Sequence, residues 1–302
     1  MPWTTADIPD QKGKVVLITG ANSGLGLETA RALLAKGATV IMACRSRRRG
    51  EVVRQSLLNA NESAGVDLLE LDLADLESVQ RVAVKLHQNY GRLDLLINNA
   101  GVMAPPRLLS KQGFELQFAV NHLGHMALTQ LVLPMMETQP SARVVSVSSG
   151  AHYFGRINWN DLQGERAYNR WGAYAQSKLA NVMFALELNT RLSKRNSSVS
   201  SLVAHPGMAR TNLQSTSISL NGSWQENLAY KLMAPLFQSA AMGALPQLHA
   251  ATAASAFGGE HYGPGGPGNF RGFPKVCPIA PAARKADDRE RLWKISQELC
   301  GC

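Results

Sequence analysis

A tyrosine and a lysine four residues apart are the side chains whose types and spacing most clearly suggest chemistry. Tyr174 and Lys178 stand in the stretch Tyr-Ala-Gln-Ser-Lys. On a helix, a separation of four places both side chains on one face. A phenol has an ordinary pKa of about 10, and a nearby ammonium group is expected to lower it toward neutrality. The pair predicts a general acid/base, although the same spacing is common by chance and its context has to decide.

A glycine-rich loop follows the first apolar run of the chain. In Thr19–Gly26, Gly20 allows a tight turn, Gly24 lets the backbone approach a pyrophosphate, and Gly26 lets a helix pack on the strand. The start of that helix offers free N–H groups to phosphate. A turn without a ligand would also explain the loop, but its place between a strand and a helix favours a dinucleotide site. The residues expected at the phosphates are Gly20, Asn22, Ser23, Gly24, Leu25 and Gly26.

The residues after the second and third apolar runs select the cofactor. An NAD enzyme usually carries a carboxylate after the second strand, whereas this chain has Cys44 and then Arg45. A guanidinium pairs with a 2′-phosphate, so we expect NADP(H), unless Arg45 is only a solvated loop residue. Asp72, followed by Leu73, either accepts a hydrogen bond from the adenine or caps the following helix.

The elements that must position these residues alternate along the chain. Six apolar runs are expected strands: Lys14–Thr19, Thr39–Ala43, Val66–Leu71, Leu93–Asn98, Arg143–Ser148 and Val199–Ala204. Helices are expected at about Leu25–Lys36, Leu76–Leu86 and around Tyr174. Near-continuous apolar strands alternating with helices indicate a parallel sheet that is covered on both faces. We therefore predict an α/β fold with a Rossmann-type doubly wound parallel sheet.

The pattern loosens after Ala204. Residues 205–223 and Gly258–Gly272 read as loops, and helices are expected at Trp224–Phe237, Ala240–Ala254 and Asp287–Leu299. No linker or repeat divides the chain, so we predict one domain over residues 1–302. Its cofactor half would be about 12–150, and its catalytic half, with C-terminal helices as a substrate lid, about 151–302.

The order of these motifs resembles the short-chain dehydrogenase/reductase family from about Lys14 to Thr211. The matching residues are Thr19–Gly26, Asn98-Asn99-Ala100-Gly101, Asn121, Ser149, Tyr174 and Lys178. The resemblance implies that Tyr174 is the acid/base and that Lys178 binds the nicotinamide ribose and tunes the tyrosine. It implies that Ser149 binds the substrate oxygen and that Asn121 holds a water that relays protons. The cofactor is then expected to touch Asn98, Ala100, Gly101, Tyr174, Lys178, Pro206, Gly207 and Thr211.

Within the family, the chain resembles retinol dehydrogenases and their soluble bacterial relatives. The stretches that carry this likeness are Ala43–Arg45, Phe118–His125, Ser148–His152 and His205–Gly207. Light-dependent protochlorophyllide reductases share part of the pattern but usually depart from it at Asn-Asn-Ala-Gly. The implied reaction is hydride transfer, from the pro-S face of the nicotinamide, between NADP(H) and a carbonyl or alcohol. The alternatives are light-driven double-bond reduction, or an NADP(H)-binding sensor that catalyses nothing.

Apolar residues should overhang the nicotinamide and line a pocket for a sizeable hydrophobic aldehyde or ketone, such as a retinoid-like one, although lid packing would use the same side chains. They are Met103, Pro105, His152, Tyr153, Phe154, Met208, Leu213, Trp224, Leu228, Met233 and Phe237. The segment Trp224–Phe237 could also touch a membrane surface. The apolar helix around Tyr174 could form a homo-oligomer interface.

Composition excludes several classes of protein. The net charge of +9 includes a local arginine run, but no basic stripe with interleaved aromatic residues indicates nucleic-acid binding. The four cysteines lack metal-ligand spacing, which predicts no metal site, and their low number favours a reducing compartment. Cys300 and Cys302 read as thiols of a frayed tail. With neither a signal sequence nor an apolar span of membrane length, we expect a cytoplasmic protein without a transmembrane segment.

Overall fold

The computed structural model describes residues 2–62, 64–210 and 237–302, and they are built around one sheet of eight strands. The strands are β1 (Val15–Thr19), β2 (Thr39–Cys44), β3 (Val66–Glu70), β4 (Leu95–Asn98), β5 (Arg143–Val147), β6 (Ser200–Ala204), β7 (His261–Pro264) and β8 (Pro274–Val276). Their order is β3-β2-β1-β4-β5-β6-β7-β8, and every pairing is parallel except that of β7 with β8. The predicted doubly wound parallel sheet is confirmed.

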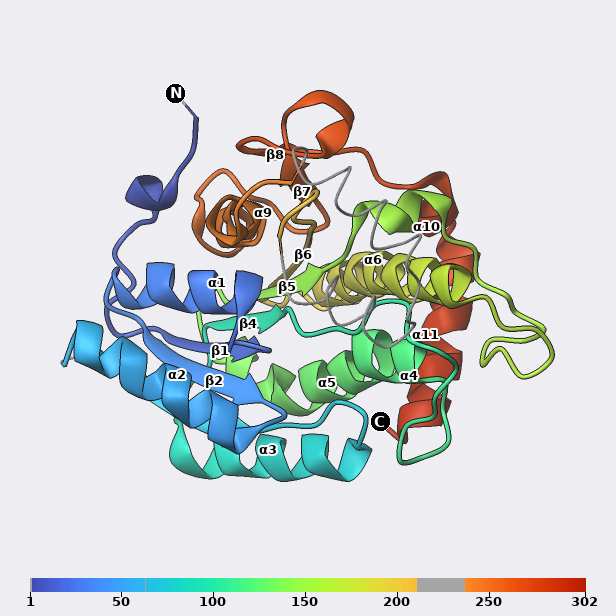
Figure 1. Cartoon of the computed structure of the whole chain (residues 1–302), viewed down its shortest axis with the longest axis horizontal. Helices are drawn as coiled ribbons and strands as arrows, with labels where there is room; N and C mark the ends of the chain where they lie inside the picture. The colour runs from blue at the N-terminus through green and yellow to red at the C-terminus, as the bar shows by residue number, and fades with distance from the viewer. Residues whose placement is uncertain (1, 63, 211–236) are drawn as a thin grey trace.

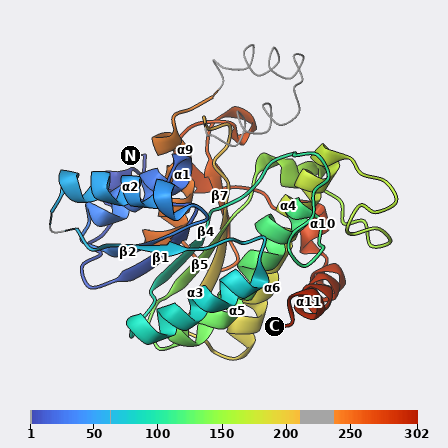
Figure 2. The same ribbon diagram turned by 60° about the horizontal axis from the view of Figure 1, so that its bottom comes forward.

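Helices cover both faces of the sheet (Figures 1 and 2). The longer ones are α1 (Gly24–Leu34), α2 (Arg47–Ala60), α3 (Leu76–Asn89), α5 (Gly124–Glu137), α6 (Arg170–Lys194), α9 (Ala240–Thr252) and α11 (Ala286–Cys300). Short segments are η1 (Thr5–Asp7), α4 (Leu116–Phe118), the π-helical η2 (Ala119–Leu123), η3 (Gly150–Phe154), η5 (Pro267–Asn269) and α10 (Pro281–Arg284). α1 packs beside α9 on one face, α3 and α5 lie side by side on the other, and α11 packs against α6.

The apolar strands explain why both faces need cover. Leu17 of β1 belongs to the core that includes α3, α5 and α6, while Val16 and Ile18 belong to the core that includes α1 and α9. All three side chains are fully buried. Alternate residues of one strand thus feed two apolar cores, the arrangement that a near-continuous apolar run in a parallel sheet requires.

The carboxyl ends of the parallel strands meet at one edge of this sheet. Neighbouring β1 and β4 lead to connections that run in opposite directions along it, toward β2 on one side and β5 on the other. In open α/β sheets such a reversal of strand order opens a crevice beyond the strand ends, where ligands bind. The strand order therefore puts the glycine loop after β1 next to the Asn98–Gly101 stretch after β4.

The C-terminal part departs from the predicted loop and tail. Gly258–Gly272 was expected to be a loop, but His261–Pro264 within it is β7, which pairs with β6 and extends the sheet. Glycine and proline hid this strand because they are poor strand formers. Cys300 is buried at the end of α11 and its thiol faces the carbonyl oxygen of Leu123 at 3.5 Å, so the expectation of a frayed tail is wrong. Most of the expected helix Trp224–Phe237 lies outside the described residues.

Candidate active site

The glycine loop is closed to any larger side chain. Gly20 and Gly24 have φ of 68° and 52°, a backbone region that favours glycine. A Cβ at Gly26 would lie 2.4 Å from the carbonyl oxygen of Gly20 and 2.6 Å from Asn99 Nδ2. Ser23, the N-cap of α1, makes no side-chain hydrogen bond to the first turn of the helix. The first-turn N–H groups of α1 therefore remain available to an anion at the helix start.

The residues after β2 divide into a buried thiol and an exposed guanidinium. Cys44 is buried, and burial raises its pKa to about 11 although the backbone N–H groups of Ala21 and Asn22 donate to its sulfur. The thiol therefore packs beneath the glycine loop, where a carboxylate would have been costly. Arg45 is exposed, and no hydrogen bond or ion pair of its side chain is found within the described residues.

Asp72 and Leu73, the pair after β3, have structural contacts. One carboxylate oxygen of Asp72 accepts a hydrogen bond from the backbone N–H of Ala74 at 2.9 Å. The N-cap of α3 is Asp75 rather than Asp72, because its side chain accepts from Glu77 N. The capping alternative for Asp72 is therefore wrong, and its second oxygen remains for another partner. Leu73 is buried against Gly124. A Cβ on Gly124 would lie 2.5 Å from the carbonyl oxygen of Leu73.

The Thr19 hydroxyl joins the ends of β1 and β4. It accepts hydrogen bonds from the backbone N–H groups of Asn99 and Ala100, both at 2.9 Å, and lies 2.9 Å from His125 Nε2. The other ring nitrogen of His125 lies 3.0 Å from the carbonyl oxygen of Asn121. This Thr19 network, defined by Thr19, Asn99, Ala100, Asn121 and His125, links the glycine loop to η2. Asn98, one residue earlier, is buried and donates to Thr129 Oγ1 at 3.0 Å.

Tyr174, on α6, lies beside Ser149, which is the second residue after β5. A side-chain hydrogen bond joins Ser149 to Tyr174, while Ser148 Oγ donates to the carbonyl oxygen of Lys178 at 2.8 Å. Burial raises the pKa of Tyr174, and the hydrogen bond from Ser149 lowers it only in part. Tyr174 therefore keeps its proton near neutrality.

Lys178 does not act on Tyr174 as expected. Its ammonium lies 5.9 Å from the centre of the tyrosine ring and donates to the carbonyl oxygen of Val147 at 3.2 Å. Burial lowers the pKa of Lys178 to about 8. The structure therefore does not show the expected lowering of the Tyr174 pKa by this lysine, because burial of the phenol raises that pKa and the opposing cause is Ser149.

Asn121 and Gly101 complete the surroundings of the lysine. The side chain of Asn121 is fixed: Oδ1 accepts from Val102 N at 2.8 Å, and Nδ2 donates to Val102 O and to Ser177 Oγ, both at 2.9 Å. A Cβ at Gly101 would lie 3.0 Å from Asn121 Oδ1 and 3.5 Å from Lys178 Nζ. The absence of a side chain at Gly101 therefore leaves room beside both polar atoms. The π-helical turn η2, a feature often found at functional sites, carries Asn121.

The residues expected around the nicotinamide and the substrate are only partly brought together. Pro206, Gly207 and Met208 follow β6 and are half-buried, while Thr211 lies outside the described residues. Phe154 is 85% exposed and His152 is fully buried, so neither has the half-buried position expected of a pocket wall. Met103, Tyr153 and Phe237 are half-buried and Pro105 is buried. Leu213, Trp224, Leu228 and Met233 lie outside the described residues.

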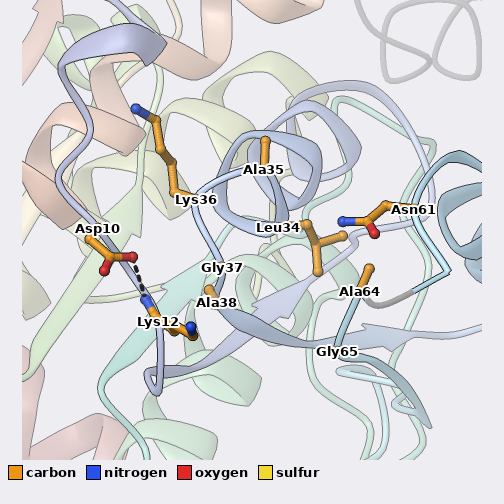
Figure 3. Close-up of a pocket in the computed structure, with 10 residues that line it drawn as sticks. All are labelled: Asp10, Lys12, Leu34, Ala35, Lys36, Gly37, Ala38, Asn61, Ala64 and Gly65. Carbon is orange, nitrogen blue, oxygen red and sulfur yellow. Dashed lines mark hydrogen bonds between the residues drawn. The ribbon is translucent and has the colours of Figure 1, made fainter.

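A surface hollow at the opposite end of the strands is not part of this arrangement. It is lined by Asp10, Lys12, Leu34, Ala35, Lys36, Gly37, Ala38, Asn61, Ala64 and Gly65 (Figure 3). Gly37 and Ala38 precede β2, and Gly65 precedes β3, so the hollow lies at the amino ends of these strands. Ligands of doubly wound sheets bind at the carboxyl ends, where the glycine loop and Tyr174 lie.

Several residues that shape the site had been given no role of their own from the sequence. Thr19, Asn99 and His125 are three members of the Thr19 network, and Gln247 of α9 reaches it by donating to Asn99 Oδ1 at 3.3 Å. His125 stands four residues after Asn121, so a helical reading of Phe118–His125 would have placed the two together. Gln247 is 148 positions from Asn99, and no local pattern points to their contact.

Known proteins similar to this chain include a protein family, a curated relative and a solved structure. The model of the family described as short chain dehydrogenase matches residues 14–220. Retinol dehydrogenase 12 of Homo sapiens is 40% identical over 289 residues, which cover 96% of this chain and 87% of that protein. A crystal structure of an uncharacterized protein from Mycobacterium paratuberculosis is 40% identical, with a TM-score of 0.82, and covers 100% of this chain and 98% of its own.

A more distant structure concerns the cofactor. A chain from Beutenbergia cavernae, provisionally assigned as an NAD(P) dependent gluconate 5-dehydrogenase, was solved with NADP bound at low occupancy. It is 25% identical, with a TM-score of 0.64, and the match covers 83% of this chain and 94% of that one. Among the helices of the described residues, none is long and apolar enough to cross a membrane.

Proposed function

This chain belongs to the short-chain dehydrogenase/reductase family, and we propose that it is an NADP(H)-dependent oxidoreductase that interconverts a carbonyl and an alcohol. The observation that carries the proposal is the joint placement of Ser149, Tyr174 and Lys178 at the same sheet edge as the glycine loop, with Lys178 beside Gly101. The likeness to retinol dehydrogenases supports an alcohol or carbonyl substrate.

The residues present fit a nicotinamide dinucleotide. The glycine loop would hold the pyrophosphate with the first-turn N–H groups of α1, because the Ser23 side chain does not cap them. Asp72, with one carboxylate oxygen free, would accept from the adenine. Ala100 and Gly101 would border the nicotinamide ribose, with Lys178 donating to its hydroxyl groups. Pro206 and Gly207 would adjoin the carboxamide. When bound, the cofactor supplies or accepts a hydride, and every proton step falls to the protein.

Tyr174 is the residue that we propose moves the proton. Its phenol is buried and keeps its hydrogen, because burial holds its pKa above the ordinary value. In carbonyl reduction, Tyr174 Oη donates that proton to the substrate oxygen as negative charge develops there. Ser149 hydrogen-bonds to Tyr174 and is placed to donate to the same oxygen. In alcohol oxidation the phenolate takes the proton back.

Lys178 and Asn121 would replace the proton that Tyr174 gives away. A lysine with a pKa of about 8 is largely charged at neutral pH and can still lose its proton. Asn121 Oδ1 accepts one hydrogen bond from Val102 N, and a carbonyl oxygen has a second lone pair. We propose that this lone pair holds a water between Asn121 and Lys178, through which the proton is restored.

Arg45 supports the preference for NADP(H) over NAD(H). Its exposed guanidinium follows β2, where a 2′-phosphate would lie, and no carboxylate stands there to repel that phosphate. The buried thiol of Cys44 occupies the preceding position and carries no charge at neutral pH, because burial raises its pKa to about 11. The NADP found with the Beutenbergia cavernae protein is consistent with the same cofactor.

A sizeable apolar aldehyde or ketone is the substrate class that we propose. Met103, Tyr153, Met208 and Phe237 are half-buried side chains on segments near the sheet edge, and half-buried apolar surface suits an apolar ligand. The name of the human relative points to a retinoid-like alcohol. A single small-molecule substrate accounts for the site, with no role for nucleic acid or for a metal.

The test is NADPH oxidation in the dark, followed by its near-ultraviolet absorbance, with aldehydes from acetaldehyde to retinal and with aromatic ketones. We expect turnover with the large apolar compounds, and far slower turnover when NADH replaces NADPH. Turnover only under illumination would instead support a protochlorophyllide-type reductase. Tight NADPH binding without turnover of any compound, in light or dark, would indicate a sensor and overturn the proposal.

A further inference from the structure

Three buried histidines from distant parts of the chain lie together beside the proposed active site. His152 belongs to η3, His205 follows β6 and His261 begins β7. Their ring centres are 4.9 Å apart for His152–His261, 5.0 Å for His205–His261 and 6.4 Å for His152–His205. Each residue is at most 2% exposed. We call these three residues the histidine cluster; His261 is its middle member.

One nitrogen of each ring is bound to the backbone, and two of these bonds reach the proposed active site. His152 Nδ1 lies 2.6 Å from the carbonyl oxygen of Ser149. The backbone N–H of Gly207 donates to His205 Nδ1 at 3.3 Å. His261 Nδ1 lies 2.8 Å from the carbonyl oxygen of Pro278, outside the site. The cluster therefore connects the backbone of Ser149 to the backbone of Gly207.

These partners fix the tautomer of every ring. A carbonyl oxygen accepts, so His152 and His261 carry their hydrogen on Nδ1 and present a bare Nε2. His205 accepts at Nδ1, so its hydrogen is on Nε2. All three Nε2 atoms are buried and have no hydrogen-bond partner among the described residues. One N–H and two lone pairs form the set that a single water molecule satisfies, by accepting one bond and donating two.

The same tautomers argue against a metal ion. A metal would need a lone pair on each Nε2, and the hydrogen on His205 Nε2 prevents that. Among the described residues, no group of three or more His, Cys, Asp and Glu side chains could hold a metal ion. Gly263 also belongs to this arrangement, because a Cβ there would lie 2.0 Å from His205 Nε2. A side chain at position 263 would therefore displace the His205 ring, and the three histidines are neutral because burial lowers their pKa.

We propose that His152, His205 and His261 are positioning residues that set the distance between Ser149 and the Pro206–Gly207 backbone, through one polar molecule of the size of water held by their Nε2 atoms. The proposal rests on the proposed function, in which Ser149 contacts the substrate oxygen and Gly207 borders the nicotinamide. None of the three needs to touch the reacting atoms. Their effect is on the alignment of groups that do, where small displacements are costly.

A pair of substitutions at His261 separates alignment from simple folding. In His261→Asn the amide can still donate to Pro278 O but cannot reach the Nε2 position, whereas in His261→Gln an amide group reaches that position. We expect His261→Asn to lower kcat by about 10- to 100-fold with the Kd for NADPH changed less than about 3-fold, and His261→Gln to recover much of the loss. His249→Asn is the matched control: His249 is also buried, but it lies on α9 against Trp3 and Tyr262, and its kcat should not change. Equal kcat in wild type and His261→Asn, or an equal loss in all three variants, would overturn the inference.

A second measurement does not depend on activity. In protein labelled with ¹⁵N-histidine, NMR distinguishes a ring protonated on Nδ1 from one protonated on Nε2. We expect His152 and His261 as Nδ1–H tautomers and His205 as the Nε2–H tautomer, with the signals of His152 and His205 displaced in His261→Asn. Nε2–H tautomers at His152 and His261 would overturn the inference even in an active enzyme. The expected tautomers in a protein without turnover would reject the proposed function and leave the cluster standing.

Discussion

The Thr19 network and the histidine cluster both support the proposed active site, but they differ in how completely their hydrogen bonds are paired. In the Thr19 network, both ring nitrogens of His125 have partners, at 2.9 and 3.0 Å. In the histidine cluster, every ring has one partnered nitrogen and one buried nitrogen for which the described part of the chain offers no partner. The first network joins the glycine loop to Asn121, and the second joins Ser149 to Gly207.

This difference indicates that the two regions support the proposed site in different ways. A fully paired buried network holds one arrangement, because breaking any bond leaves a costly unpaired group. A cluster with unpaired nitrogens depends on whatever molecule completes it. We therefore expect the Thr19 network, on the cofactor side, to be rigid and intolerant of substitution. Substitutions in the histidine cluster, on the substrate side, should change kcat more than they change the stability of the fold.

Tyr174→Phe should have the largest effect, because it removes the group that we propose donates the proton. Loss of the proton donor is expected to lower kcat by about 1000-fold, while NADPH still binds. Steady-state kinetics and the quenching of protein fluorescence by NADPH measure the two quantities. Ser148→Ala is the matched control for loss of a buried hydroxyl near the site, since Ser148 Oγ donates to Lys178 O and not to Tyr174. Full activity in Tyr174→Phe would remove the acid/base assignment.

Gly26→Ala should disrupt the Thr19 network and the glycine loop while leaving the histidine cluster unchanged. The new Cβ would lie 2.6 Å from Asn99 Nδ2 and 2.4 Å from the Gly20 carbonyl oxygen, so the loop must open. We expect the Kd for NADPH to rise by about 100-fold or more, as for the loss of about 3 kcal/mol of binding free energy. Gly91→Ala is the control, because a Cβ there has no neighbour within 4 Å. Unchanged NADPH binding in Gly26→Ala would show that the loop is not the phosphate site.

Arg45→Glu should change the preference for NADPH over NADH without disturbing the buried Thr19 network. The exposed guanidinium makes no hydrogen bond or ion pair with the described residues, so folding should be unaffected. The ratio of kcat/KM for NADPH to that for NADH should fall by about 100-fold, because a charge-assisted bond to the 2′-phosphate becomes a repulsion. Arg48→Glu, in the same arginine run, should change the ratio far less. Equal effects of the two variants would mean that only net charge matters.

The parts of this comparison that the sequence revealed are the local ones. Tyr174 and Lys178 share a helix, and Gly20, Gly24 and Gly26 share a turn, so spacing alone brought each group together. The strands before Ala204 could be located because apolar runs mark buried strands. β7 could not, since His261-Tyr-Gly-Pro resembles a loop. The histidine cluster needs β6, β7 and η3 in register, which only the folded chain provides.

Acid should destabilise the protein through both regions. Burial lowers the pKa of His125 and of His261 to about 4 and that of His205 well below its ordinary value. The unfolded chain therefore binds more protons as the pH falls below about 6.5, and stability is lost in that direction. Each histidine with a pKa of about 4 should cost about 2 kcal/mol between pH 6.5 and pH 5. Urea unfolding at the two pH values measures this, and an unchanged free energy of unfolding would contradict the buried, neutral state of these rings.

Lys178 should give a smaller effect, which appears at alkaline pH. Burial lowers its pKa to about 8, so the ammonium is lost above that value and can no longer restore the proton of Tyr174. The kcat of carbonyl reduction should fall by about 10-fold for each pH unit above about 8. Lys178→Arg, which stays charged, should lack this decline in whatever activity it retains. A flat profile in the wild type up to pH 10 would argue against a proton-relay role for Lys178.

The most direct test of the central claim is the fate of a deuterium placed on the pro-S side of the nicotinamide C4 of NADPH. After incubation with a large apolar aldehyde in the dark, mass spectrometry of the alcohol shows whether the label was transferred. We predict one deuterium on the carbinol carbon in the wild type, and labelled alcohol that forms about 1000-fold more slowly in Tyr174→Phe. Alcohol that forms without deuterium, or no alcohol from any aldehyde or ketone despite bound NADPH, would contradict it.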